Sequence, residues 1–238
     1  MSISVIVPAR NEERNLAKVI KDLSTISSVN QIIIVEGNSS DNTWIVAKEL
    51  ELKFTGQVQT LKQSGFDKFN AVQCGISAAI NEQVMIWDAD NTVNITHQIE
   101  LINFANKNKK ALWTGNRLKG KREKHSMFFF NLLGNHLFSI FWVPFTGMKK
   151  IDTLCGSKIF PKTLLEYCPE IIKNNDPFGD FSILAAAYNK KINVYSIPVN
   201  YLARTYGTTN IHRWRNGFQL LKIYIYFILS LLLKKFKK

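Results

Sequence analysis

The chain has 238 residues, a length that suits one large α/β domain or two closely fused halves. A hydrophobic content of 46% and a formal net charge of +13 exclude a disordered chain and indicate an anionic partner: nucleotide phosphates, nucleic acid or an acidic membrane face. The three cysteines have no C-x-x-C spacing, which argues against a disulfide framework or a zinc site. The first residues run directly into a strand pattern, so no signal peptide is expected.

Strand and helix patterns alternate through the first half of the chain. Apolar runs predict strands at 4–7, 31–35, 58–61, 84–87 and 111–115. Between them, capping residues and amphipathic stretches predict helices at 11–26, 42–52, 68–80 and 96–106. Strands that alternate with single helices imply parallel crossovers, so we expect a doubly wound, mostly parallel sheet of the α/β class.

An Asp-Ala-Asp segment ends the fourth apolar run. In an extended strand Asp88 and Asp90 point to one side, whereas Ala89 points to the other. Two carboxylates at one spot repel unless a cation lies between them, and Mg²⁺ or Mn²⁺ takes oxygen ligands while leaving positions open for phosphate. In an open α/β sheet this pair would lie at the ligand crevice beyond the strand ends. A solvated acidic turn explains an isolated Asp-x-Asp pair equally well.

After Arg117 the sequence changes to a basic loop and an aromatic stretch. The loop carries four basic residues: Lys119, Lys121, Arg122 and Lys124. The following residues, 127–145, are dense in Phe, Leu and Trp at roughly helical spacing. This composition is consistent with a core helix or with a helix that lies in a membrane interface.

Globular patterning then returns. A turn that begins near Asp152 leads into a strand ending at Phe160, a helix follows Asp180, and another strand spans 192–199. Asp180 is either an acid that faces an acceptor or the cap of its helix. A loop with Arg204, Tyr206 and residues 213–215 is expected after the last strand.

The C-terminal segment 218–233 is strongly apolar and is followed by Lys-Lys-Phe-Lys-Lys. It is slightly shorter than the ~20 residues that span a bilayer comfortably. We expect a tilted or surface-lying helix that its lysines anchor on an anionic membrane surface.

Several segments occur in an order that identifies a family resemblance. They are 4–13, 33–43, 68–71 with Gly75, 88–90, 115–117, 152–156 and 198–204. Together they resemble the family 2 glycosyltransferases with the GT-A fold, particularly the polyprenyl-phosphate branch that includes dolichyl-phosphate mannose synthase. The resemblance covers nearly the whole chain, from residue 4 to about residue 215.

The resemblance implies a Rossmann-like nucleotide half and assigns roles to individual residues. The implied donor-binding residues are Pro8, Ala9, Arg10, Glu12, Val35, Glu36, Lys68, Asp88, Ala89 and Asp90. Among these, Asp88 and Asp90 would hold the donor diphosphate through Mg²⁺ or Mn²⁺. Arg117 and Arg204 correspond to positions that contact phosphate, and Asp152 corresponds to an acid that lines the sugar and acceptor site. These last three are the candidate catalytic residues.

We therefore expect residues 1–217 to form the glycosyltransferase domain, with a nucleotide-sugar half (1–117) and an acceptor half (118–217), and residues 218–238 to form a membrane-associating tail. The expected reaction moves a sugar from a nucleotide sugar to a polyprenyl-phosphate-type lipid in cell-surface glycan synthesis, at the cytoplasmic side of the cell membrane. No nucleic-acid partner is expected, and the sequence predicts no oligomeric state.

Other functions fit parts of the same pattern. A saccharide hydroxyl acceptor would need Asp152 or Asp180 as a general base, whereas a lipid phosphate is already anionic. A nucleotidyltransferase could use the same sheet and acid pair, but no Gly-rich Arg-Lys signature occurs near residue 10. A non-catalytic membrane-binding or nucleic-acid-binding protein would explain the charge but not the acids at a strand end.

Overall fold

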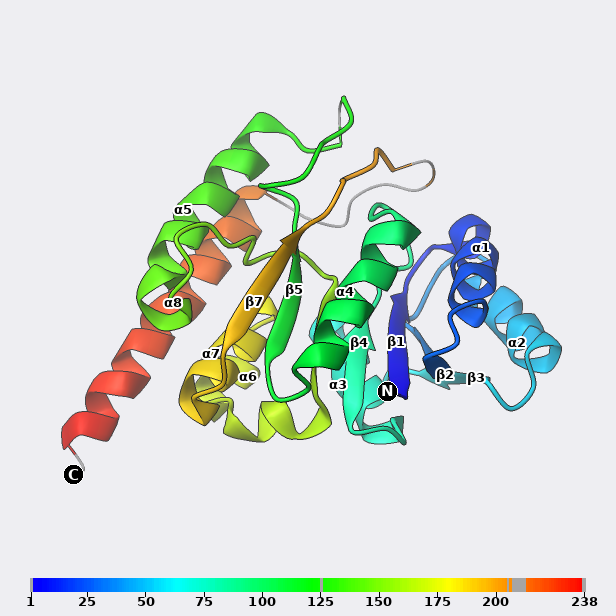
Figure 1. The fold of residues 1–238 in the computed structure, drawn as a ribbon, viewed down its shortest axis with the longest axis horizontal. Coiled ribbons are helices and arrows are strands. Elements are labelled where there is room, and N and C mark those ends of the chain that lie inside the picture. The colour runs from blue at the N-terminus through cyan, green and yellow to red at the C-terminus, as the bar shows by residue number, and fades with distance from the viewer. Residues whose placement is uncertain (1, 125, 205, 207–212, 237–238) are drawn as a thin grey trace.

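The structure is a computed structural model that describes residues 2–124, 126–204, 206 and 213–236, with the backbone alone at 213 and 234–236. Within these residues the strands form a seven-stranded sheet in the order β3-β2-β1-β4-β6-β5-β7 (Figure 1). The strands are β1 (Ile3–Ala9), β2 (Val29–Glu36), β3 (Val58–Lys62), β4 (Gln83–Ile86), β5 (Leu112–Asn116), β6 (Lys158–Pro161) and β7 (Val194–Pro198). The lysines after residue 233, expected to anchor the tail, lie outside the described side chains.

Helices cover both faces of the sheet. One face packs against α1 (Glu13–Ser24), α2 (Thr43–Lys53) and α4 (Ile95–Lys107). The other packs against α3 (Asp67–Ala78), α5 (Phe129–Thr146), the 3₁₀ helix η1 (Lys162–Tyr167), α6 (Glu170–Lys173), α7 (Asp180–Lys190) and α8 (Arg213–Phe236). Successive strand residues point to opposite faces, so Val5 and Val7 enter the first layer while Ile6 enters the second. The predicted α/β sheet is confirmed.

One strand runs against the others. β6 is antiparallel to β4 and β5, whereas the remaining strand pairs of the described sheet are parallel. The carboxyl ends of the six parallel strands therefore meet at one edge, which we call the carboxyl edge, and β6 begins there instead of ending there. The segment that leads into β6, including Asp152 and Gly156, is consequently brought to the same edge as Asp88.

Asparagines form the turns at this edge. Asn11 after β1, Asn38 after β2 and Asn91 after β4 have φ values of 57°, 57° and 55°. Asn tolerates this left-handed region better than most residues, because its short polar side chain can bond to nearby backbone. The three turns reverse the chain directly after the strands and keep the functional side chains close to the strand ends.

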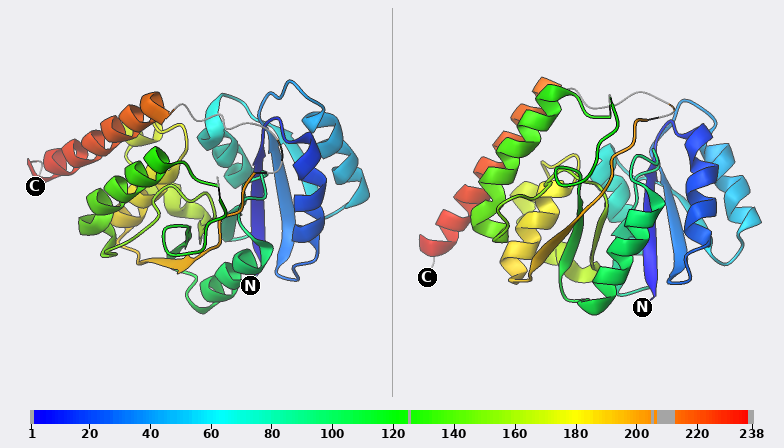
Figure 2. Two further views of the ribbon diagram at one scale, coloured as in Figure 1. Left: turned by 90° about the horizontal axis from the view of Figure 1, so that it is seen from above. Right: turned by 45° about the horizontal axis from the view of Figure 1, so that its top comes forward.

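The aromatic segment and the apolar tail pack together. α5 and α8 run side by side at the end of the sheet that is remote from α1 and α2 (Figures 1 and 2). Their ring contacts include Phe130 with Trp214, with centroids 6.0 Å apart, and Trp142 stacked on Phe227 at 5.0 Å. The loop expected at residues 213–215 is wrong, because α8 already begins at Arg213. Residues 218–236 continue that helix, and part of it belongs to the protein core.

Candidate active site

Asp88 lies just beyond β4 and forms an ion pair with a lysine. The strand ends at Ile86, and the Asp88 Oδ1 atom accepts a hydrogen bond from Lys68 Nζ in the first turn of α3. Gly156 closes the other side of this carboxylate. A Cβ atom at Gly156 would lie only 2.0 Å from Asp88 Oδ2, so this approach requires glycine.

Electrostatics hold this pair in its charged form. Burial alone would raise the pKa of Asp88, but the charge and hydrogen bond of Lys68, with Arg117 and Lys158 nearby, lower it below its usual value. Burial would likewise lower the pKa of Lys68, yet the carboxylates of Asp88, Asp180 and Asp90 raise it. Both side chains are therefore ionised at neutral pH.

Arg204 joins three strands of the carboxyl edge. From the segment after β7, its Nη1 donates to Glu12 Oε1 at 3.1 Å and its Nη2 donates to Asp90 Oδ2 at 2.7 Å. The other Asp90 oxygen accepts from the Thr92 backbone and hydroxyl. Burial, together with the negative charges of Asp90 and Asp88, raises the pKa of Glu12, although the Asn15 hydrogen bond and Arg204 oppose this shift.

The geometry of the acid pair differs from the expected extended strand. Residues 89 and 90 form a turn, so Asp88 and Asp90 bind different cations, Lys68 and Arg204. Ala89, between them, is buried in the core.

Arg117 and Asp152 form a second ion pair in the same region. Arg117 Nε and Nη2 donate to the two oxygens of Asp152 at 2.6 and 3.0 Å, and the Arg117 backbone N–H also donates to it. Asn135 of α5 and the Leu154 backbone supply two more donors to Asp152. Burial alone would raise the pKa of Asp152, but Arg117 and these hydrogen bonds lower it. The Tyr201 ring lies under the guanidinium, 4.9 Å from Arg117 Cζ.

A buried lysine supports the base of the site. Lys158 at the start of β6 is fully buried, and its Nζ donates to the Cys155 carbonyl and to Asp180 Oδ1. Asp180 begins α7, where its own charge is favourable beside the helix N-terminus. The structure thus places Asp180 in a buried ion pair, with its side chain 10% exposed.

The remaining predicted donor residues lie at the ends of β1 and β2. Pro8 and Ala9 pair with Val35 and Glu36 in the parallel ladder. Arg10 is exposed after β1, next to Gly37. Glu36 is buried and accepts a hydrogen bond from the Ser39 backbone. Val35 does not present its side chain to the edge, because that side chain is fully buried in the core.

The acid pair matches the ligand chemistry of a hard divalent cation. Asp88 and Asp90 offer carboxylate oxygens, which Mg²⁺ and Mn²⁺ prefer. Among the described residues, no third His, Cys, Asp or Glu joins them in a group that could enclose a metal. A cation that keeps water and phosphate oxygens as its other ligands needs only one or two protein carboxylates, so the residues present fit such an ion.

Three residues that contribute to the site were given no role in the sequence analysis. Asn135 is a polar residue in an aromatic helix, Lys158 is a charged residue at the start of an apolar strand, and Gly156 occurs in the Asp-x-x-x-Gly segment. The first two are visible as polar interruptions of apolar patterns. Their partners, Asp152 and Asp180, could not be inferred, because the contacts depend on how distant elements pack.

A mostly parallel α/β sheet with acids and basic side chains gathered at its carboxyl edge has the architecture of a GT-A glycosyltransferase. The profile of the family "Glycosyl transferase family 2" matches residues 4–157. The chain belongs to this family, which confirms both the resemblance and the expected glycosyltransferase class.

Known relatives agree with this family. The chain is 34% identical over 102 residues to 4,4'-diaponeurosporenoate glycosyltransferase of Staphylococcus haemolyticus, a match to 42% of this chain and 27% of that protein. It is 26% identical to dolichyl-phosphate beta-glucosyltransferase ALG5D of Trichomonas vaginalis, over 84% of this chain and 65% of the relative. Identity to the UDP-N-acetylglucosamine--dolichyl-phosphate N-acetylglucosaminyltransferase of Methanococcus voltae is 23%, over 92% of both chains. The chain thus spans less than two thirds of the first two relatives.

Solved structures share the fold at low sequence identity. Glucosyl-3-phosphoglycerate synthase from Mycobacterium tuberculosis superposes with a TM-score of 0.68 and 18% identity, over 93% of this chain and 80% of that one. Its complex with Mn²⁺, uridine diphosphate and phosphoglyceric acid gives a TM-score of 0.66 at 15% identity, with 94% and 78% coverage. The GT-A fold expected from the sequence is confirmed.

Proposed function

We propose that this protein is a metal-dependent glycosyltransferase that moves a sugar from a nucleotide sugar to a polyprenyl-phosphate-type lipid. One observation carries the choice of acceptor. Asn135, on the inner face of α5, donates to the site residue Asp152 at 2.6 Å, while Leu133 and Leu137 of the same helix are exposed. A surface suited to lipid is thus joined directly to the reaction site.

The donor side is built from the carboxyl edge. Asp88 and Asp90 would hold Mg²⁺ or Mn²⁺, which would supply positive charge to the nucleoside diphosphate as it departs. Lys68 and Arg204 are already paired with these acids and add positive charge at the same place. Solved structures that share this fold hold Mn²⁺ or Mg²⁺ together with uridine diphosphate, which supports this role.

The charges of the two candidate bases favour an acceptor that is already ionised. Asp152 accepts hydrogen bonds from a fork of Arg117 and from three further donors, and its lowered pKa makes it a weak base. Asp180 is paired with the buried Lys158. A phosphate oxygen needs no proton removed before it attacks the anomeric carbon, whereas a sugar hydroxyl does. The saccharide acceptor remains the alternative function, and it would need a base other than these two.

The membrane is the proposed location of the reaction. α8 contains one stretch, Trp214–Leu233, that is long and apolar enough to cross a membrane. Its inner residues Leu220, Ile223 and Phe227 are nevertheless buried against the protein, so only one face is free. This one-sided burial supports a helix that lies on the membrane surface with its free face in the lipid, and the cytoplasmic leaflet is the side we propose for it.

An acceptor assay tests the proposal. The purified chain is incubated with a panel of nucleotide sugars and Mn²⁺, with a short-chain polyprenyl phosphate or with soluble saccharides. We expect one nucleotide sugar to be consumed faster when the lipid phosphate is present, and the activity to disappear with a chelator. A soluble saccharide that proves the better acceptor would reject the lipid assignment.

A further inference from the structure

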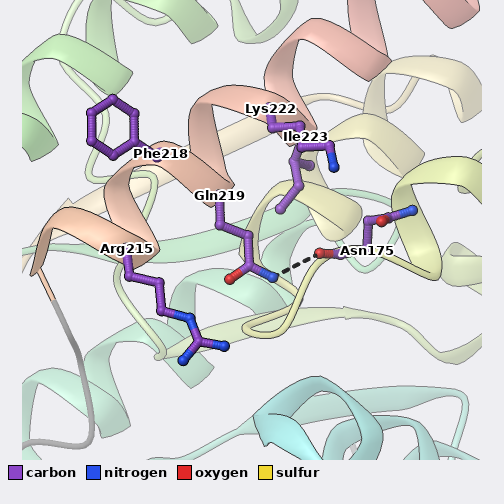
Figure 3. Close-up of a pocket in the computed structure, with 6 residues that line it drawn as sticks. All are labelled: Asn175, Arg215, Phe218, Gln219, Lys222 and Ile223. Carbon is purple, nitrogen blue, oxygen red and sulfur yellow. Dashed lines mark hydrogen bonds between the residues drawn. The ribbon is translucent and has the colours of Figure 1, made fainter.

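A groove lies where the first turns of α8 pass the loop between α6 and α7 (Figure 3). It has a volume of about 370 Å³ and is lined by Asn175, Arg215, Phe218, Gln219, Lys222 and Ile223. This volume is within the range of small-ligand sites. The lining includes none of the donor or catalytic residues considered above.

The groove carries two cations and a polar anchor on one face of a helix. Arg215, Gln219 and Lys222 are spaced i, i+4, i+7, so their side chains leave α8 on the same side. Gln219 Nε2 donates to the Asn175 carbonyl at 3.3 Å and links α8 to the loop after α6. Within the described part of the chain, neither Arg215 nor Lys222 has an acidic partner. Lys222 Nζ lies 5.4 Å from the centre of the Tyr226 ring.

An exposed apolar stripe borders these cations. Trp214, Phe218, Leu221 and Ile225 are spaced i, i+4, i+7, i+11, and they are 71, 69, 36 and 49% exposed. Phe218 is three residues from Arg215 and four residues from Lys222, so the apolar stripe borders both cations on the helix surface. Cations beside an apolar face suit a phosphate group that is attached to hydrocarbon chains.

We propose that this groove binds the headgroup phosphate of an anionic phospholipid, with Arg215 and Lys222 as its cations. A guanidinium can bind two phosphate oxygens at once, and an ammonium adds a second point of charge. Phe218 and Leu221 contact the acyl region beside the headgroup. The inference rests on the proposed membrane docking of α8 and goes beyond it by assigning a fixed lipid site outside the reaction centre.

Vesicle flotation tests this site. The double variant Arg215→Gln/Lys222→Gln is compared with Lys109→Gln/Lys110→Gln, which removes the same charge from two exposed lysines that precede β5. Vesicles are phosphatidylcholine alone or phosphatidylcholine with phosphatidylglycerol. We expect the groove variant to lose roughly tenfold in affinity for the phosphatidylglycerol vesicles, and the control to lose less than about threefold. Thermal unfolding of both variants is measured as a control that they remain folded.

The outcomes separate this inference from the proposed function. Equal binding of both variants to phosphatidylglycerol vesicles overturns the lipid site and leaves membrane docking in place. Failure of the unmodified chain to bind either vesicle overturns membrane docking itself, and the lipid site with it. In a third arm, transfer to a short-chain polyprenyl phosphate in detergent is expected to be unchanged in the groove variant. A loss of transfer there, with vesicle binding intact, overturns the inference and reassigns the groove to the acceptor.

Discussion

The position of the Asp88 carboxylate depends on the absence of a side chain at residue 156. We predict that Gly156→Ala displaces this carboxylate, since the new Cβ would lie 2.0 Å from Asp88 Oδ2. A misplacement of about 1 Å at a reacting group can cost on the order of 10²-fold in rate. The measurement is kcat with the donor identified by the acceptor assay. Gly134→Ala is the matched control, because a Cβ there meets no atom within 4 Å. Equal rates in the two variants would contradict the prediction.

The two arginines are expected to respond differently to the same substitution. Arg117→Lys removes the fork from the fully buried Asp152, so we predict a loss of about 1–3 kcal/mol in the free energy of unfolding. Arg204 is 29% exposed, so Arg204→Lys should change stability by less than about 1 kcal/mol while reducing activity. Urea unfolding and steady-state kinetics check both. If the substitution of Arg204 proves the more destabilising one, the structural role given to Arg117 is wrong.

At acid pH the Asp152 carboxylate should no longer contribute to the stability of the fold. Its pKa is lower in the folded chain than in the unfolded chain, so its ionised form stabilises the fold above the usual pKa of about 3.9. That contribution is lost as the pH falls through the lowered value. Asp152→Asn has no such contribution to lose. We therefore predict that the stability difference between the unmodified chain and Asp152→Asn narrows below about pH 4 in urea titrations. A stability difference that does not change with pH would show that the ionised Asp152 carboxylate does not stabilise the fold.

At the scale of elements, α8 has one face that is buried in the core and one that is exposed. Its inner face belongs to the core, so we expect removal of residues 218–238 to lower the stability of the fold in addition to weakening the proposed membrane binding. Substitutions on each face separate the two effects. Ile225→Ser/Leu229→Ser changes residues that are 49 and 48% exposed, and we predict weaker vesicle binding with unchanged thermal stability.

On the inner face, Phe227→Ala changes a fully buried ring and should lower the free energy of unfolding by about 3–5 kcal/mol. Loss of stability from the outer substitutions would contradict the assignment of faces.

Most elements were predictable from the sequence, and their errors have physical causes. The strands of the first half follow from apolar runs because parallel strands are buried on both sides. The start of α8 was missed because Arg213 to Arg215 read as a polar loop, although they form the first turn of a helix. In addition, hydropathy cannot predict which face is buried in a helix that is apolar nearly all round. Its buried face is determined by how α8 packs against α5, α6 and α7.

The whole molecule carries an excess of positive charge, which has a measurable consequence. With a formal net charge of +13, we predict that binding to anionic vesicles weakens strongly as salt rises. Flotation in low and high salt measures this effect. Neutral vesicles serve as the control, because apolar contacts depend much less on salt. If binding to anionic vesicles does not change with salt, electrostatic attraction does not drive it.

The candidate site was predicted in composition but not in connectivity. The order of motifs brought Asp88, Asp90, Arg117, Asp152 and Arg204 forward as candidates. Which acid pairs with which base could not be predicted, because β6 enters the sheet against the other strands and delivers Asp152 and Lys158 from an unexpected direction. Pairing of this kind is a property of the assembled sheet.

The ion pair between Glu12 and Arg204 also has a consequence for folding during translation. These residues are 192 positions apart. At roughly 5–20 residues per second, Arg204 is translated roughly 10–40 s after Glu12. During that interval the nascent chain can assemble β1, β2 and β4, but Glu12 and Asp90 have no guanidinium between them. A ribosome that stalls before residue 204 would therefore hold a largely formed first part of the sheet in which Glu12 and Asp90 still repel each other. The contact that joins both acids therefore forms only after residue 204 has been translated.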